Sequence, residues 1–390
     1  MRKMLIIAVL ALALAAAPAF ASVQNIKIGG DIESTYLVRD QFDLGGGEHL
    51  SNTQDYNQAL FFTQTRLTVS ADLTDNVSAT AGLLNERPWG EEAQNAEDND
   101  IDLNLAFVTL REMLYSPLTV VIGRQNFKYG NSFIIDSGGT NNNIAGASGL
   151  NGVADDFTKR TAQDAIRLIL DYNPLTVELL ASKIDANNNG GFNPNADDVD
   201  LYGINANYNL GDAWKTVAEA YYFAHINSSV ANATGGTAGL KADTMFIPGL
   251  RASTNPIKGL NVQGEVAWQL GNKASTSTTS TNDNVARHAF GGQAIVNYML
   301  PFEQTAKWSP VVTGVYTFVS GDEDPDGRGT HNSAGSTDSI KDDYRAWDPM
   351  YENQGGGTIY NTLFDLSNAH ILMLSGQVAP IEDVTLKGTW

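Results

Sequence analysis

The chain has 390 residues, 44 acidic and 24 basic, and a formal net charge of −20. Hydrophobic residues make up 42% of it, which excludes wholesale disorder. The negative charge argues against a nucleic-acid partner, because nucleic acid is bound by clustered Lys and Arg. No cysteine is present, so a disulfide, a zinc–thiolate site and a thiol nucleophile are all excluded.

The N-terminal segment has the order of a secretory signal peptide. A basic pair, Arg2 and Lys3, precedes the apolar stretch Met4–Ala17, and a small-residue A-x-A triplet follows. The apolar stretch is shorter than a membrane-spanning helix requires. We therefore expect residues 1–21 to be a signal peptide and residues 22–390 to form the exported domain.

The exported part alternates between apolar and polar residues, which is typical of strands with one apolar and one wet face. Most alternating segments run for about ten residues or more, the length that a tilted strand needs to cross a bilayer. Strands of soluble proteins are usually nearer five or six residues. The clearest alternating segments are Asn25–Arg39, Phe61–Leu73, Asp100–Thr109, Leu201–Leu210 and Leu260–Leu270.

Short and long connections alternate between these strands. The short ones are 74–76, 113–117, 172–174, 211–213, 255–259, 302–308 and 379–383. The long polar ones are 40–57, 87–99, 131–160, 187–199, 227–239, 271–285 and 321–361. Short turns at one rim and long loops at the other predict an all-β fold, a transmembrane antiparallel β-barrel of the outer-membrane type, with its turns in the periplasm. A soluble sandwich or solenoid is the alternative.

The strand count predicts that the barrel is incomplete at its C-terminus. We count about fifteen strands, the last being Val384–Trp390. Bacterial barrels of this class have an even number of strands, so that both chain ends face the periplasm. An outward-running last strand therefore predicts that the final strands of a barrel of 16–18 are missing. The alternative is that one strand is miscounted and Trp390 is the true end.

Several motifs resemble the alginate export family. In chain order they are Thr65–Val77, Leu105–Leu110, Ser116–Leu118, Gly123–Gln125, Ser320–Gly327 and Trp347–Tyr351. The resemblance implies an outer-membrane barrel, eighteen-stranded in the known exporter, so that about three strands would be missing here. That exporter lines its pore with many Arg and Lys for a polyanion, whereas the predicted wet faces of this chain carry few bases.

Charged residues on the wet faces are the candidate pore lining, since a base facing lipid at mid-depth costs about 2–4 kcal/mol. The predicted set is Lys27, Asp31, Glu33, Arg66, Asp72, Asp102, Arg124, Arg167, Asp171, Glu178, Glu265 and Arg287. A lumen of mixed or negative sign favours cations and repels polyanions. Two interpretations of the arginines stay open. They either form a ladder for anionic or hydroxylated solutes, or pair with Asp72, Asp171 or Glu178 and fill the interior.

One acidic loop has the spacing of a calcium site. Asp322, Asp324 and Asp326 precede Gly327, which suits the sharp turn of a calcium loop. The bidentate Glu expected six residues later is replaced by Ser333. A solvated acidic loop is therefore the alternative to an extracellular calcium site.

No residue pattern indicates catalysis. A hydrolase needs Ser and His oriented together, and His370 and Ser375 fall on opposite faces of one predicted strand.

We expect a passive outer-membrane channel for a small hydrophilic solute or a polysaccharide, with no cofactor. Outer-membrane lipid, lipopolysaccharide and a periplasmic protein are the expected partners. The alternatives are a general diffusion porin, a barrel enzyme and a structural or adhesive barrel. The long connection 131–160 is a candidate for folding into the lumen as a constriction.

Overall fold

The structure is a computed structural model. It describes residues 24–39, 58–90, 101–136, 158–160, 162–186, 198–228, 242–274, 285–300, 308–323, 343–351 and 366–390. The expected signal peptide lies outside these residues. Among the residues that are described, no helix is both long and apolar enough to span a membrane.

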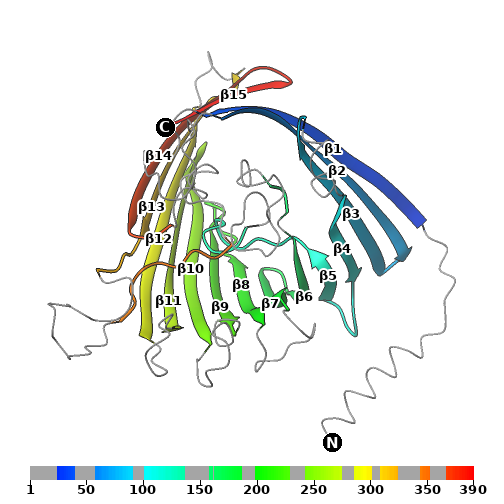
Figure 1. The fold of residues 1–390 in the computed structure, drawn as a ribbon, viewed down its shortest axis with the longest axis horizontal. Helices are drawn as coiled ribbons and strands as arrows, with labels where there is room; N and C mark the ends of the chain where they lie inside the picture. Colours follow the sequence, from blue (N-terminus) through cyan, green and yellow to red (C-terminus); the bar gives the residue numbers. More distant parts are fainter. Residues whose placement is uncertain are drawn as a thin grey trace, which may run out of the picture.

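Within the described residues, fifteen antiparallel strands form one sheet, in which each strand pairs with its neighbours in the sequence (Figure 1). They are β1 (Gln24–Arg39), β2 (Gln58–Thr74), β3 (Val77–Pro88), β4 (Asp102–Leu110), β5 (Leu118–Gln125), β6 (Gln163–Asp171), β7 (Leu175–Asp185), β8 (Val199–Asn209), β9 (Val217–Asn227), β10 (Asp243–Ile257), β11 (Leu260–Lys273), β12 (Val285–Met299), β13 (Val311–Val319), β14 (Ala369–Ile381) and β15 (Val384–Thr389). The expected count of about fifteen strands is confirmed, and so is the antiparallel order.

The outer face of the sheet is apolar. In β1, Ile28 and Ile32 are 71% and 74% exposed, while Asp31 between them points to the other face. The same alternation continues through the later strands, for example at Leu250, Val312 and Leu372, all of which are exposed. A contiguous apolar surface of this extent is typical of a face that lies against another apolar phase.

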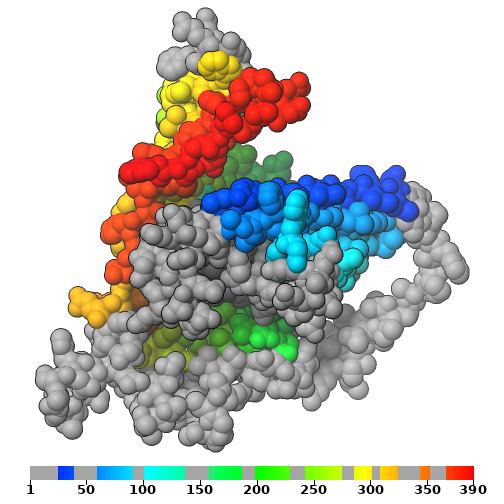
Figure 2. All heavy atoms as spheres, turned by 45° about the horizontal axis from the view of Figure 1, so that its top comes forward, coloured from blue at the N-terminus to red at the C-terminus, as the bar shows by residue number. Residues whose placement is uncertain are grey.

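Two segments outside the strands lie on the inner side of the curved sheet (Figure 1). We call residues 126–136, which follow β5, the first inner segment, and residues 343–351, between β13 and β14, the second inner segment. They meet in a short parallel ladder, because Ile135 bridges to Tyr351 and the Tyr351 N–H donates to the Ile134 carbonyl at 3.1 Å. In Figure 2, β1–β3 (blue) and β13–β15 (orange to red) form two walls of the sheet.

The core of the molecule lies between these inner segments and β8–β12. Tyr129 of the first segment contacts Phe223 at 5.1 Å between ring centroids, and Phe133 stacks on Trp347 at 5.2 Å. Gly291 makes room for this stack, since a Cβ there would lie 2.7 Å from Phe133 and 2.9 Å from Trp347. The cluster comprises Phe127, Tyr129, Phe133, Ile134, Ile135, Leu201, Tyr221, Phe223, Met245, Ile247, Ala267, Ala289, Trp347, Met350 and Tyr351, with others. The hypothesis that connection 131–160 turns inward therefore holds for its first residues, 131–136.

Candidate functional site: the inner face of the sheet

Most of the predicted pore residues share the inner face. The register pairs Asp31 with Arg66, and both lie on the face that carries Gln64 and Glu33. By strand alternation the same face carries Lys27, Asp31, Glu33, Arg66, Asp72, Arg167, Asp171, Glu178, Glu265 and Arg287. Asp102 lies beside segment 158–160, where it forms an ion pair with Arg160. Whether these side chains line a conducting path stays a prediction.

Arg124 is the exception, and the expectation that it faces inward is corrected. Val121 pairs with Arg167 on the inner face, so Arg124, three residues further along β5, points to the outer face. There its Nη1 lies 3.4 Å from the Asp164 carboxylate. Arg124 is the last residue but one of β5, at the long-loop rim. The cost of an outward charge is small near the membrane interface, unlike at mid-depth.

The wall formed by β1–β4 holds segment 158–160 through one buried carboxylate. Glu86 is 2% exposed and accepts hydrogen bonds from the Thr158 hydroxyl at 2.7 Å and the Lys159 N–H at 2.8 Å. The Gln64 side chain donates to the same carboxylate at 2.5 Å. Lys159 also reaches Glu33 at 3.5 Å. The sequence pattern did not single out Glu86, although alternation places it on the wet face of β3.

Two carboxylates accept hydrogen bonds from backbone N–H groups of the first inner segment. The Gly130 N–H donates to Glu219 at 3.0 Å, and the Asn131 N–H donates to Glu265 at 2.6 Å. The Tyr221 hydroxyl donates to the second oxygen of Glu265 at 2.8 Å. Gly130 has φ +59, and a Cβ there would lie 2.5 Å from Glu265, so both the conformation and the contact favour glycine. We call Glu219 and Glu265 with these two amides the carboxylate latch.

Arg251 completes the latch from β10. Its Nη1 lies 3.2 Å from Glu219, directly across the strand pair, and its Nη2 donates to Gln263 at 2.9 Å. Its Nε donates to the Asn131 side-chain oxygen at 2.5 Å. Glu219 and Arg251 were not among the predicted residues. Their wet-face positions in β9 and β10 were the available signal.

A second set of contacts holds the first inner segment at Tyr129. Arg167 forms a two-bond pair with Glu178, at 2.6 and 2.8 Å, and the Tyr129 hydroxyl donates to the same carboxylate. Burial, followed by the charge of Glu178, raises the pKa of Tyr129 well above its usual range, so its hydroxyl keeps its proton. The arginine is thus neutralised by a neighbouring acid, which favours the interior-pairing interpretation over a free ladder.

The second inner segment is held by a charge cluster at β10–β12. Arg287 is fully buried and lies 2.7 Å from both Asp243 and Asp348. Lys273 lies 2.7 Å from Asp348 and 3.7 Å from Asp243. The Gln269 amide exchanges two hydrogen bonds with the backbone of Asp348, at 2.6 and 2.9 Å. We call these two bases and two acids the Arg287 cluster.

The stabilisation that the Arg287 cluster provides should depend on pH. Burial alone would raise the pKa of Asp348, but Arg287 and Lys273 outweigh it and hold that pKa below the ordinary 3.8. Stabilisation from Asp348 is therefore fully present above pH 3.8 and is lost as the pH falls through the lowered pKa. We expect the emission of Trp347, taken as the difference from a Trp347→Phe variant, to stay constant from pH 7 to 5 and to change only below about pH 4. An equal change between pH 7 and 5 would contradict this assignment.

The acidic loop does not assemble a metal site in the part that can be seen. Asp322 accepts a hydrogen bond from the Arg345 N–H at 2.9 Å. Asp324 and Asp326 lie outside the described residues. Within the described ranges, no group of three or more His, Cys, Asp or Glu side chains is placed to hold a metal. The calcium site stays a prediction.

The protein is a single antiparallel sheet with an apolar outer face and a charged inner face, and the two inner segments lie on the inner face. This arrangement defines an outer-membrane β-barrel channel. The family model described as alginate export matches residues 24–390. The chain belongs to that family, which places it in the outer membrane as a channel for a polysaccharide or another solute.

Solved structures similar to this chain are porins. Salmonella typhi OmpF is 11% identical, with 90% of this chain and 85% of that chain covered and a TM-score of 0.44. A triple mutant of the Rhodopseudomonas blastica porin is 12% identical, with 94% and 93% covered and a TM-score of 0.45. No curated protein matches the chain.

Proposed function

We propose that this outer-membrane channel passes neutral or cationic hydrophilic solutes by passive diffusion, and that transport is its whole activity. The observation that carries the proposal is the pairing of the inner-face bases with acids. Ion pairs with carboxylates are formed by Arg66, Arg160, Arg167, Arg251, Lys273 and Arg287. A base that is already neutralised contributes little to attracting an anion.

Several inner-face carboxylates, in contrast, accept hydrogen bonds from neutral donors. Asp72 accepts from the Asn25 amide at 3.2 Å, and Asp171 from the Asn173 N–H at 3.1 Å. Because their negative charge is not cancelled by these donors, the lumen concentrates cations over anions.

Export of a polyuronate is the second candidate, and family membership favours it. A polyanion would need inner-face bases that are free to contact its carboxylates. Because the inner-face arginines are already paired with acids, polyuronate export is less favoured here than passage of a neutral or cationic solute. We further propose that residues 1–21 are a signal peptide removed on export, that residues 22–390 form the barrel domain, and that lipopolysaccharide and outer-membrane lipid surround it.

Ion selectivity tests the proposed charge preference. We expect the protein in a planar bilayer, under a KCl gradient, to give a reversal potential of the sign for K⁺ over Cl⁻. Asp72→Asn should reduce that preference, while Asp383→Asn in the short turn between β14 and β15 should leave it unchanged. Alginate oligomers should not block the current. Anion selectivity, or block by the oligomers, would favour polyuronate export instead.

A further inference from the structure

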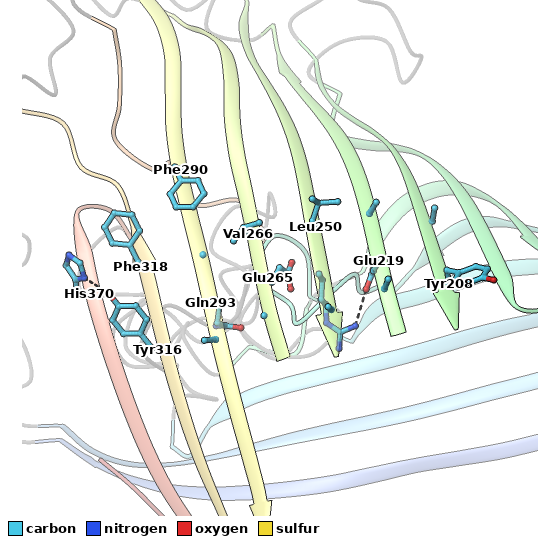
Figure 3. A pocket seen from close by; sticks show the side chains of 18 of the residues that line it. Tyr208, Glu219, Leu250, Glu265, Val266, Phe290, Gln293, Tyr316, Phe318 and His370 are labelled. Atoms are coloured by element: carbon cyan, nitrogen blue, oxygen red, sulfur yellow. Dashed lines mark hydrogen bonds and ion pairs between the residues drawn. The ribbon is translucent and has the colours of Figure 1, made fainter. Parts of the chain in front are cut away.

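The outer face of the sheet carries a trough of about 980 Å³ across β7–β14 (Figure 3). Its floor is one row of outward residues on six adjacent strands, in which four small residues lie between two tyrosines. In strand order the row is Tyr208, Ala218, Ala252, Gly264, Ala294 and Tyr316. We call this feature the outer trough. The Glu219, Glu265 and Gln293 side chains next to it belong to the inner face.

An aromatic ridge closes one side of the outer trough. Successive ring centroids lie 5.4 Å apart from Trp268 to Phe290, 6.1 Å from Phe290 to Phe318, and 4.9 Å from Phe318 to His370. Figure 3 shows Phe290, Phe318 and His370 together, with Tyr208 at the far end of the trough. The Tyr316 hydroxyl and His370 Nδ1 bond each other at 2.7 Å, which removes two polar groups from the apolar surface.

The outer trough rises from the short-turn rim. Tyr208 is the last residue but one of β8, whereas Tyr316 is the sixth residue of β13. Five strand spacings of about 4.8 Å give the row a length of about 24 Å. With strands tilted about 40°, such a row climbs about 15 Å, which is half of a hydrocarbon core about 30 Å thick. The trough therefore spans one leaflet, on the periplasmic side where the short turns lie.

Two lysines lie in the short connections at the rim from which the outer trough rises. Lys215 is in the connection between β8 and β9, Lys258 is in the turn between β10 and β11, and both are exposed. The Asn255 N–H donates to the Trp214 carbonyl at 2.9 Å, so the first connection lies against the end of β10. The nearby Asp212 carboxylate accepts from the Thr216 N–H and hydroxyl, each at 2.7 Å. Asp212 is therefore engaged by Thr216, and the two exposed lysines lie in short connections at the level where lipid headgroups are expected.

We propose that the outer trough is a binding site for one acyl chain of an anionic phospholipid of the periplasmic leaflet, with its phosphate beside Lys215 and Lys258. The outer wall is surrounded by lipid, and the small residues of the floor beside the aromatic ridge leave a furrow that a methylene chain fills. Filling it gains dispersion contacts that a straight run of small side chains would otherwise lack. The lysines supply the charge complementary to a phosphate.

Two glycines give a matched pair of variants for the test. A Cβ at Gly264, in the floor of the trough, meets no atom within 4 Å, and the same holds at Gly376 of β14, outside the trough. Gly376 pairs with Val312, which is exposed on the outer face. Gly264→Leu therefore fills the trough, and Gly376→Leu adds the same side chain elsewhere on the lipid-facing wall.

The experiment is native mass spectrometry of the full chain in detergent, titrated with phosphatidylglycerol. We expect the wild type and Gly376→Leu to retain one lipid, and Gly264→Leu to bind it at least about tenfold more weakly, equivalent to about 1.4 kcal/mol. Lys215→Asn with Lys258→Gln should remove the preference for phosphatidylglycerol over phosphatidylcholine. Bilayer conductance of each variant reports whether it has folded.

Two results would overturn the proposal. Equal lipid retention by folded Gly264→Leu and Gly376→Leu would show that the trough does not bind the chain. A wild-type dimer that Gly264→Leu converts to a monomer would show that the trough is an interface between copies.

Discussion

Replacing Arg287 by methionine should lower the free energy of unfolding by about 3–5 kcal/mol, because it removes the fully buried cation that pairs with two partly buried acids. Arg287 is fully buried and contacts Asp243 and Asp348 at 2.7 Å each. Lys273 remains, but its 3.7 Å distance to Asp243 cannot replace that contact. Urea unfolding in lipid vesicles, followed by tryptophan emission, measures the change.

Arg66→Met is the matched control for this prediction. Arg66 also makes two bonds to one acid, Asp31, at 2.9 and 3.1 Å, but both side chains are nearly half exposed. Exposed pairs contribute about 0–1 kcal/mol. Similar losses in the two variants would show that burial does not set the strength of the Arg287 cluster, and our account of how the second inner segment is held would fail.

Removing the carboxylate latch should release the first inner segment and raise the single-channel conductance by about twofold or more, since inward segments set the open cross-section. Glu219→Ala with Glu265→Ala deletes the acceptors of the Gly130 and Asn131 amides. Gly130→Val should act in the same direction by another route, because a side chain at φ +59 is strained and its Cβ would lie 2.5 Å from Glu265.

Asp31→Ala separates a released segment from a changed lumen charge. Asp31 is an inner-face acid bonded to Arg66, so its removal changes the lumen charge without touching the first inner segment. We expect it to alter selectivity slightly and to leave conductance near the wild-type value. An equal rise in conductance for Asp31→Ala would mean that charge, and not the latch, sets the current.

The strands could be predicted from the sequence because alternation is a local property. β11 was expected over Leu260–Leu270 and extends to Lys273, and β15 was expected from Val384 and begins there. The face of each strand followed from the same period in most cases. The inward orientation predicted for Arg124 was wrong because the residue lies at the rim. A charge can point outward there, whereas the prediction used the cost of an outward charge at mid-depth.

The inner segments could not be predicted from the same signal. Phe223, Met245 and Ile247 are apolar on the inner face, where alternation predicts polar residues. Their partners come from residues 126–136, which are far away in the sequence, and no local period reports such a contact. The Glu219–Arg251 pair was missed although the sequence carried a signal for it. The two residues have opposite charges and lie on the wet faces of the neighbouring strands β9 and β10.

Single-cysteine labelling tests the central claim most directly, because the chain has no cysteine of its own. On β2, Thr68 and Ser70 share the inner face with Arg66, while Leu67 and Val69 are exposed on the outer face. In intact outer-membrane vesicles, we expect a membrane-impermeant maleimide to label Thr68→Cys and Ser70→Cys but not Leu67→Cys or Val69→Cys. Labelling of all four, or of the outer pair alone, would contradict a water-filled interior enclosed by a lipid-facing wall.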